Sequence, residues 1–99
     1  MRTNPYLFHP VHAQVTNLHY TLAAPAHVAI DVIDPNGSFV GNVLPSTAQP
    51  AGDYEFSWDG RNPAGAIVST EGSYTLRLTA VDDASGQSFS RSATVLVAD

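Results

Sequence analysis

The sequence predicts an all-β protein, an immunoglobulin-like antiparallel β-sandwich of about seven short strands joined by Greek-key connections. Three observations support this fold class. Apolar residues recur at every second position through most of the chain, which is the period of a half-buried strand. Turn residues separate these segments at intervals of about ten residues, as in other sandwiches. No helical period continues for the roughly ten residues of an ordinary helix.

The first half of the chain contains three predicted strands and one broken segment. Apolar and polar residues alternate in VTNLHYTL (15–22) and again in HVAIDVI (27–33). The letters DPNG follow and predict a hairpin turn, because Pro presets φ and Gly adopts a positive φ at low cost. SFVGNVL (38–44) then returns as a short strand, whereas the two prolines and the glycine of PSTAQPAGD (45–53) predict a segment too broken to pair. The inward side chains are those of Leu18, Tyr20, Leu22, Val28, Ile30 and Val32.

The second half contains three more predicted strands. The first, in YEFSW (54–58), places an aromatic residue at every second position. GSYTLRLTAVDD (72–83) alternates strictly and is followed by a turn. In SFSRSATVLVAD (88–99) the alternation blurs, and we expect a β-bulge there. The inward side chains of the first two are Tyr54, Phe56, Trp58, Tyr74, Leu76, Leu78 and Ala80.

A chain of 99 residues has the size of one domain and leaves no room for a second core. We therefore assign residues 1–99 to a single domain, with 1–13 as an N-terminal strand or linker and 14–98 as the core. The ordered pattern begins abruptly after Met1, so we expect a fragment of a larger protein, without its leader and with Met1 supplied for expression.

Charge and composition exclude several classes of function. The net charge is -5, lysine is absent, and the four arginines are scattered, whereas a nucleic-acid-binding protein needs a basic stripe. No cysteine is present, so neither a disulfide nor a thiolate metal site can form. No apolar run approaches the ~20 residues that a membrane-spanning helix needs.

The segment YEFSWDGRNPAG, from Tyr54 to Gly65, is best interpreted as a corner of the β fold. Gly60 can adopt a positive φ, and the Asp59 carboxylate can accept backbone N–H groups of the turn that follows. A bound cation is the alternative, since a calcium loop can be counted from Gly60. Only Asn62 would supply a side-chain oxygen early in that loop, and Ala64 would supply none. We expect a structural corner and no cofactor.

Four histidines, His9, His12, His19 and His27, raise the question of a metal site. Prolines around the first two make a helix improbable there, so their spacing of three does not bring them onto one face. The other two lie on consecutive predicted strands, and adjacent antiparallel strands could bring them together. Surface histidines are the favoured interpretation, and a weak transition-metal site remains the alternative.

No motif in the sequence indicates an enzyme active site. Gly-x-Ser-x-Gly is absent, and the serines lie in turns or on outward strand faces. Asp82 and Asp83 are adjacent in a turn, where neighbouring side chains diverge instead of sharing a proton. A small core also leaves no room for a pocket. We therefore expect no catalytic activity.

Several segments share a pattern with a known family. They are VAIDVIDPNGSFV, AGDYEFSW, WDGRNPAG and AIVSTEGSYTLRLTAVD, and the resemblance that they carry covers the chain from about Val15 to Val97. This pattern resembles the immunoglobulin-like domain of the flagellar hook-capping protein FlgD, a module that also occurs in secreted and cell-surface bacterial proteins. The sequence departs from the family in STEGSY, where Thr70 and Glu71 are inserted. The resemblance implies a structural motif formed by Trp58, Asp59, Gly60, Gly65, Gly72 and Tyr74.

The resemblance favours a non-catalytic structural, spacer or protein-docking module of a larger bacterial protein, located outside the cell or on its surface. Its partners would be the neighbouring domains of the same polypeptide, with another cell-surface protein as a further candidate. Two alternatives stay open. One is a domain that binds a carbohydrate or protein, which would need exposed aromatic residues on one face. The other is the immunoglobulin-like part of a flagellar hook-assembly scaffold.

We expect a monomer in solution, because the predicted edge strands carry residues that oppose strand addition. Pro5 and Pro10 lie in the N-terminal segment, and Gly41 and Pro45 lie in or beside SFVGNVL. The net charge of -5 adds repulsion. If the chain dimerised, the exposed apolar residues would be sought among Tyr6, Phe8 and Phe39.

Overall fold

The computed structural model describes residues 2–4, 7–10, 14–68 and 71–98. Expectations that concern Met1, Pro5, Tyr6, His12 and Thr70 lie outside the described residues. No helix in the described ranges is long and apolar enough to cross a bilayer. The strands are β1 (Arg2–Asn4), β2 (Leu7–Phe8), β3 (Thr16–Leu22), β4 (Ala26–Ile33), β5 (Phe39–Gln49), β6 (Gly52–Trp58), β7 (Gly72–Asp82) and β8 (Ser88–Val97).

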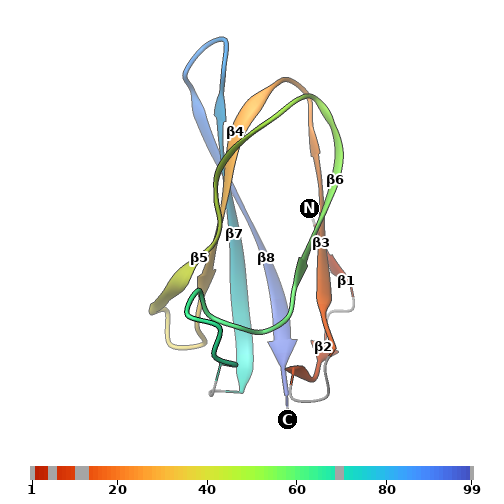
Figure 1. Ribbon diagram of the computed structural model, residues 1–99, viewed down its shortest axis with the longest axis vertical. Coiled ribbons are helices and arrows are strands. Elements are labelled where there is room, and N and C mark those ends of the chain that lie inside the picture. Colours follow the sequence, from red (N-terminus) through yellow and green to blue (C-terminus); the bar gives the residue numbers. More distant parts are fainter. Residues whose placement is uncertain (1, 5–6, 11–13, 69–70, 99) are drawn as a thin grey trace.

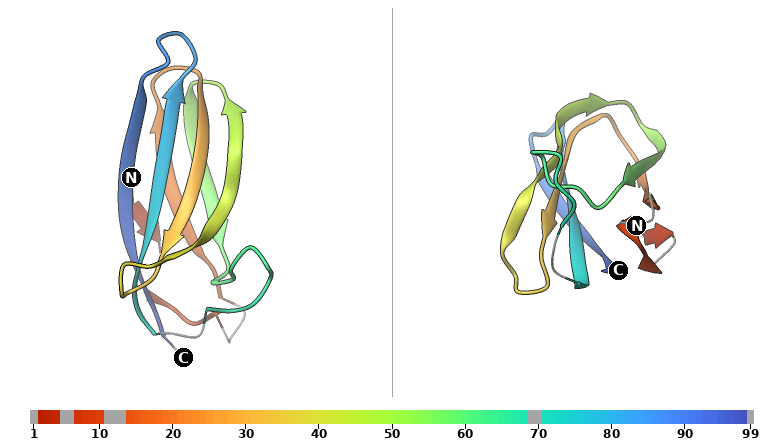
Figure 2. Two further views of the ribbon diagram at one scale, coloured as in Figure 1. Left: turned by 90° about the vertical axis from the view of Figure 1, so that its left-hand side faces the viewer. Right: turned by 60° about the horizontal axis from the view of Figure 1, so that its bottom comes forward.

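The strands form two sheets that pack face to face (Figure 1). The small sheet has the order β1-β3-β6, and the large sheet has the order β2-β8-β7-β4-β5. The chain passes between the sheets at every connection except β4 to β5 and β7 to β8. The left view of Figure 2 shows the large sheet with β8 toward one edge and β5 at the other. The predicted immunoglobulin-like β-sandwich is therefore confirmed.

The core is built by the predicted alternation. The side chains expected to point inward from β3, β4 and β7 are all buried. Of the aromatic residues of β6, Trp58 is buried, whereas Tyr54 and Phe56 are only partly covered, because β6 is an edge strand of the small sheet. Phe8 precedes residue 14, where we expected the core to begin, yet it is fully buried.

The segment PSTAQPAGD is not broken as predicted, because β5 continues to Gln49 and pairs with β4. Val28 pairs with Thr47 and Ile30 pairs with Leu44, so β5 has one more residue than β4 in this interval. The extra residue makes a bulge that includes Pro45. A proline can occupy such a position on an edge strand, where one side of the backbone needs no partner.

The prediction of a β-bulge in the last strand is wrong. The register between β7 and β8 runs without a shift from Gly72 opposite Val97 to Val81 opposite Ser88. The alternation blurs for another reason: residues 88–92 are exposed, and the hairpin of β7 and β8 extends beyond the neighbouring connections (Figure 1). Both faces of β8 are therefore accessible at this end.

Candidate functional site

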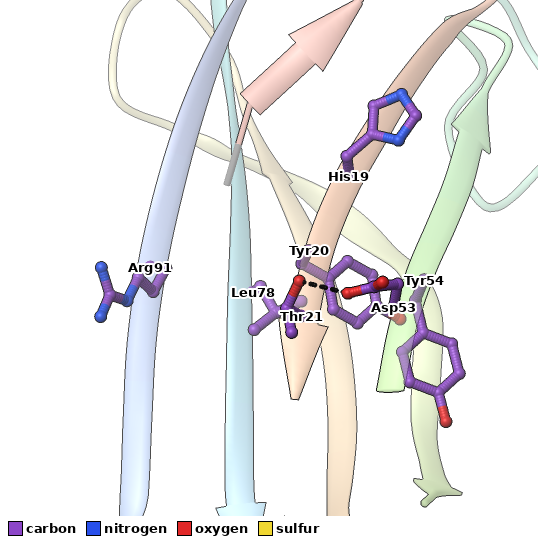
Figure 3. A pocket seen from close by; sticks show the side chains of 7 residues that line it. All are labelled: His19, Tyr20, Thr21, Asp53, Tyr54, Leu78 and Arg91. Atoms are coloured by element: carbon purple, nitrogen blue, oxygen red, sulfur yellow. Dashed lines mark hydrogen bonds between the residues drawn. The ribbon is translucent and has the colours of Figure 1, made fainter. Parts of the chain in front are cut away.

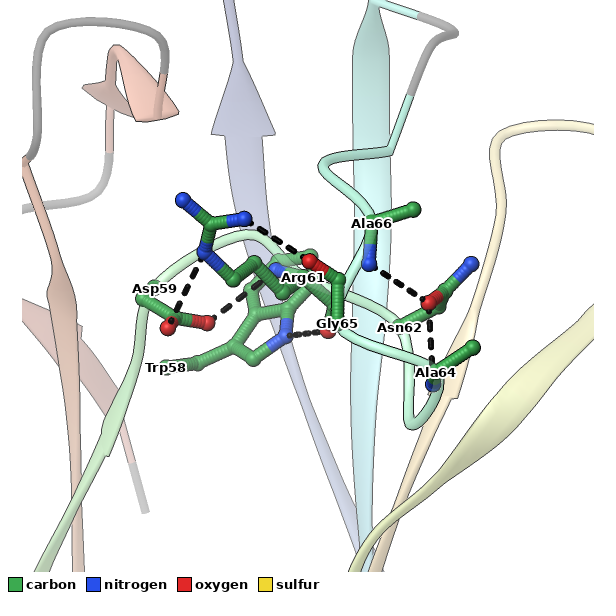
Figure 4. Close-up of polar contacts among 7 residues, drawn as sticks. All are labelled: Trp58, Asp59, Arg61, Asn62, Ala64, Gly65 and Ala66. Carbon is green, nitrogen blue, oxygen red and sulfur yellow. Dashed lines mark hydrogen bonds and ion pairs between the residues drawn. The ribbon is translucent and has the colours of Figure 1, made fainter.

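The predicted corner forms around Trp58, at the end of β6 (Figure 4). The indole is 2% exposed. It packs edge-on against Phe8, with the ring centroids 5.6 Å apart, and lies 5.7 Å from the ring of Tyr74. Its Nε1 donates a hydrogen bond of 3.0 Å to the carbonyl oxygen of Arg61. One side chain therefore joins β2, β7 and the loop that follows β6.

Asp59 and Arg61 fix the backbone of this corner. Asp59 Oδ1 accepts a 3.1 Å hydrogen bond from the Arg61 backbone N–H, and Asp59 Oδ2 lies 3.6 Å from Arg61 Nε. Arg61 Nη1 donates a 2.7 Å hydrogen bond to the carbonyl oxygen of Gly65. Because both charged side chains are about half exposed, their mutual attraction contributes little. The hydrogen bonds to the backbone give the corner its shape, and Asp59 acts as an acceptor for the turn.

Asn62 closes the rest of the loop. Its Oδ1 accepts hydrogen bonds of 3.0 Å from the backbone N–H groups of Ala64 and Ala66. The Asn62 N–H donates to the Ala66 carbonyl oxygen at 2.8 Å, and the Gly65 N–H donates to the Asn62 carbonyl oxygen at 2.9 Å. This use of an asparagine side chain to imitate backbone bonding is common in turns. The polar groups of the loop are thus directed at one another.

Two glycines of the predicted motif have distinct surroundings. Gly60 has a φ of +78°, and a Cβ atom there would lie 2.5 Å from Pro10 Cγ. Side chains are therefore disfavoured at this position both by backbone conformation and by packing. Gly72 opens β7, two residues before Tyr74, which is 1% exposed. A shared role of the six motif residues stays a prediction.

The two metal-site alternatives find few ligands in the structure. The side-chain oxygen of Asn62, which a cation in the corner would need, already accepts two N–H groups. The backbone N–H of His9 donates a 3.0 Å hydrogen bond to Gln14 Oε1, and His12 lies outside the described residues. Within the described ranges, no three His, Asp or Glu side chains gather in a way that could hold a metal ion.

His19 and His27 each lie beside a carboxylate. His19 Nδ1 is 3.5 Å from Glu55 Oε2, and His27 Nδ1 is 2.6 Å from Asp83 Oδ1. The expectation that adjacent strands would bring the two histidines together is wrong, because β3 belongs to the small sheet and β4 to the large sheet. Sequence alternation identifies the face of a strand but not its neighbour.

A groove that the sequence did not reveal opens between β3 and β8 (Figure 3). It consists of a hollow of about 650 Å³ and a second of about 300 Å³, and both are lined by Thr21, Leu78 and Arg91. We call these two hollows together the lateral groove. Thr21 Oγ1 donates a 2.8 Å hydrogen bond to Asp53 Oδ1. The rest of the lining comes from His19, Tyr20, Tyr54, Leu22, Ala23, Ala24, Ala26, Ala80, Asp82 and Phe89.

Two titrating groups of the lateral groove have shifted pKa values. Burial raises the pKa of the Tyr20 hydroxyl, although its hydrogen bond to Gln49 acts in the opposite direction. Backbone N–H groups of Ser85 and Ala84 lower the pKa of the Asp82 carboxyl. Tyr20 is stabilised in its neutral form and Asp82 in its charged form, so neither shift favours proton exchange near neutral pH.

Among the residues that the structure describes, the two most exposed aromatic side chains do not lie together on one face, as a carbohydrate-binding platform would require. Phe39 is 63% exposed and Phe89 is 55% exposed. Phe39 lies on β5, at one edge of the large sheet, and Phe89 lies on β8, toward the other edge. Because Phe39 and Phe89 lie toward opposite edges of the large sheet, they do not form one platform for a ligand. Their arrangement therefore does not favour the ligand-binding alternative.

Comparisons with known proteins identify one family. The model of the family described as FlgD Ig-like domain matches residues 11–84. The crystal structure of FlgD from P. aeruginosa is similar over 84% of this chain and 60% of its own, with a TM-score of 0.66 and 25% sequence identity. This chain thus corresponds to less than two thirds of that protein. No curated protein matches it.

These matches correct the predicted location. The expectation of an extracellular or cell-surface module is wrong, because the family model and the similar crystal structure both belong to FlgD, the flagellar hook-capping protein. The sequence resemblance includes that protein as well as the secreted proteins that use the same module. A module found in several settings does not by itself specify a compartment.

Proposed function

Because this chain belongs to the FlgD Ig-like domain family, we propose that it is the immunoglobulin-like part of a flagellar hook-assembly scaffold and serves there as a non-catalytic docking domain. The observation that carries this proposal is the family match over residues 11–84. The proposed partners are the other domains of the same polypeptide and neighbouring subunits of the scaffold.

The distribution of polar groups supports docking over catalysis. Asp59, Arg61 and Asn62 lie together in the loop that follows β6, and they bond to the backbone of that loop. An active site needs a nucleophile or base that points at a space for substrate. In the lateral groove, Asp53 accepts a hydrogen bond from Thr21 and His19 lies 3.5 Å from Glu55, so both groups contact neighbouring side chains.

A domain exchange tests the proposed function. In a bacterium that lacks its own hook-capping protein, FlgD from P. aeruginosa would be supplied with its immunoglobulin-like domain replaced by this chain. We expect hooks, counted by electron microscopy, and restored swimming. A matched control would carry an unrelated immunoglobulin-like sandwich of the same length in place of this chain.

The two exchanges together separate docking from spacing. Docking predicts hooks with this chain and none with the unrelated sandwich, because only the former presents the required surface. Equal restoration by both would show that the domain acts as a spacer and would refute docking. An absence of hooks with this chain, when the hybrid protein accumulates and its isolated domain is folded, would refute the scaffold role.

A further inference from the structure

The first half of β8 has an open backbone edge. On one side, residues 88–97 pair with β7. On the other side, the only described partner is β2, which pairs with Leu96 and Val97 alone. The edge of residues 88–93, about 20 Å long, therefore has no strand partner in the described part of the chain. We call it the β8 open edge.

This edge lacks most of the features that protect sheet edges. Protein edges are usually blunted by proline, by a bulge, by a charged side chain or by a covering segment, and of these the β8 open edge has only the charge of Arg91. The β8 open edge contains no proline, its register with β7 has no shift, and it lies on the projecting hairpin (Figure 1). By contrast, the opposite edge strand of the large sheet, β5, contains both Pro45 and a bulge.

Phe89 gives the β8 open edge an apolar contact site. It pairs with Ala80 and lies on the inner face of the sheet, two positions from Arg91 and four from the buried Ala93. The small sheet does not cover it there, so the ring is 55% exposed. The ring lines the smaller hollow of the lateral groove beside Leu22. An added strand would cover this apolar surface.

Arg91 determines which strand could be added. Arg61 lies 3.6 Å from Asp59, and Arg77 lies 3.4 Å from Asp31, but Arg91 has no ion-pair partner among the described residues. Figure 3 shows its side chain directed away from Thr21 and Asp53 and leaving β8 on the side opposite β7. The guanidinium therefore lies beside the β8 open edge. Covering an unpaired charge is costly unless the covering group neutralises it.

We propose that the β8 open edge binds an extended segment of another scaffold subunit by strand addition. The segment carries a carboxylate opposite Arg91 and an apolar side chain opposite Phe89, two positions apart, because alternate residues of a strand share a face. The inference rests on the proposed function, since it names the surface through which this domain holds a neighbour. Arg91 rejects strands that lack the carboxylate and so provides selectivity.

Short peptides test this inference directly. The probe is a capped peptide of the sequence Thr-Val-Thr-Asp-Thr-Val-Thr, which reads the same in both directions and so presents its central Asp to Arg91 in either orientation. Its matched partner has Lys in place of Asp. NMR titration of the 99-residue chain should show saturable shifts confined to residues 88–93 and nearby groove residues, with affinity for the Asp peptide about five-fold or more above that for the Lys peptide.

Variants of the chain provide the controls. Arg91→Asp should reverse the preference, so that the Lys peptide binds more tightly, and this rescue cannot arise from misfolding. Arg77→Ala removes a positive charge from a neighbouring strand and should leave the preference unchanged. Equal affinity for both peptides, or no saturable binding at millimolar concentration, would overturn the inference. The inference would also be overturned if the Arg91→Ala variant formed a dimer and bound neither peptide. Arg91 would then serve only to prevent association of the β8 open edge with a second copy.

The hybrid FlgD described above separates this inference from the proposed function. If the hybrid makes hooks and the same hybrid with Arg91→Asp makes them equally well, the β8 open edge is not the docking surface and the scaffold role stands. If the parent hybrid makes no hooks although the Asp peptide binds selectively to residues 88–93, the scaffold role fails and the strand-addition site stands.

Discussion

Replacing Trp58 with Ala should remove a large part of the stability of this domain. The indole is 2% exposed and lies between the rings of Phe8 and Tyr74, so its loss leaves a cavity bounded by both sheets. Truncating a buried aromatic side chain to Ala costs about 3–5 kcal/mol, and the lost hydrogen bond to the Arg61 carbonyl oxygen adds about 1 kcal/mol. Domains of this size unfold with about 5–15 kcal/mol in total.

Urea unfolding measures this change. Circular dichroism is the suitable signal, because Trp58 is the only tryptophan and its fluorescence disappears with the substitution. A loss of about 4–6 kcal/mol, with a urea dependence of about 1–3 kcal/mol per molar, lowers the midpoint by about 1–6 M. Trp58→Phe retains an aromatic ring but loses the donor, and should cost about 1–3 kcal/mol. A Trp58→Ala variant within about 1 kcal/mol of the parent, the size of an average substitution, would refute this account of the core.

Three further predictions concern the turns and the association state. Gly60→Ala should lower the melting temperature more than Gly86→Ala does: both glycines have positive φ, but only at Gly60 would the new Cβ meet Pro10, at 2.5 Å. Comparing the two melting curves isolates that contact, and equal losses would contradict it. Asp82→Ala should destabilise the chain above pH 4 and progressively less below it. Backbone hydrogen bonds, that from the Ser85 N–H first, lower the pKa of the Asp82 carboxyl from its ordinary 3.8. The stability that the charged carboxylate contributes is therefore lost as the pH falls through the lowered pKa. Urea midpoints of the parent and the variant from pH 2 to pH 7 test this. Sedimentation at tens of micromolar should show a monomer, and a stable dimer would refute this.

The predictions from sequence succeeded where one strand carries its own signal. Leu18, Val28 and Leu76 belong to strictly alternating segments, and all three are fully buried. The DPNG turn also formed as expected: Gly37 has a φ of +85°, and the Asp34 carboxylate accepts the N–H of Ser38. These features depend on neighbours in the chain, so the residues alone determine them.

The failures concern which strands are neighbours. A proline ends a central strand but is tolerated in an edge strand. The sequence does not reveal that β5, which contains Pro45, is an edge strand. The separation of His19 from His27 follows from the passage of the chain between the two sheets. Both errors arise from sheet order, which depends on contacts between residues that are distant in the chain.

The candidate docking surface was missed for a related reason. Phe89 and Arg91 alternate with serines in SFSRS, and a charge on the inner face of a strand was the available signal. We attributed the irregular pattern to a bulge. Phe89 and Arg91 are exposed because the small sheet ends before it reaches them. Where the small sheet ends depends on the lengths of other strands.

The N-terminal segment contributes to both sheets, since β1 pairs with β3 and β2 pairs with β8. This division determines how the domain resists mechanical force. When the two ends of the chain are pulled apart, the parallel β2 is loaded along its length against β8, so that its bonds must yield together. The short ladder of Leu7 and Phe8, secured by the buried Phe8 ring, therefore resists tension in shear.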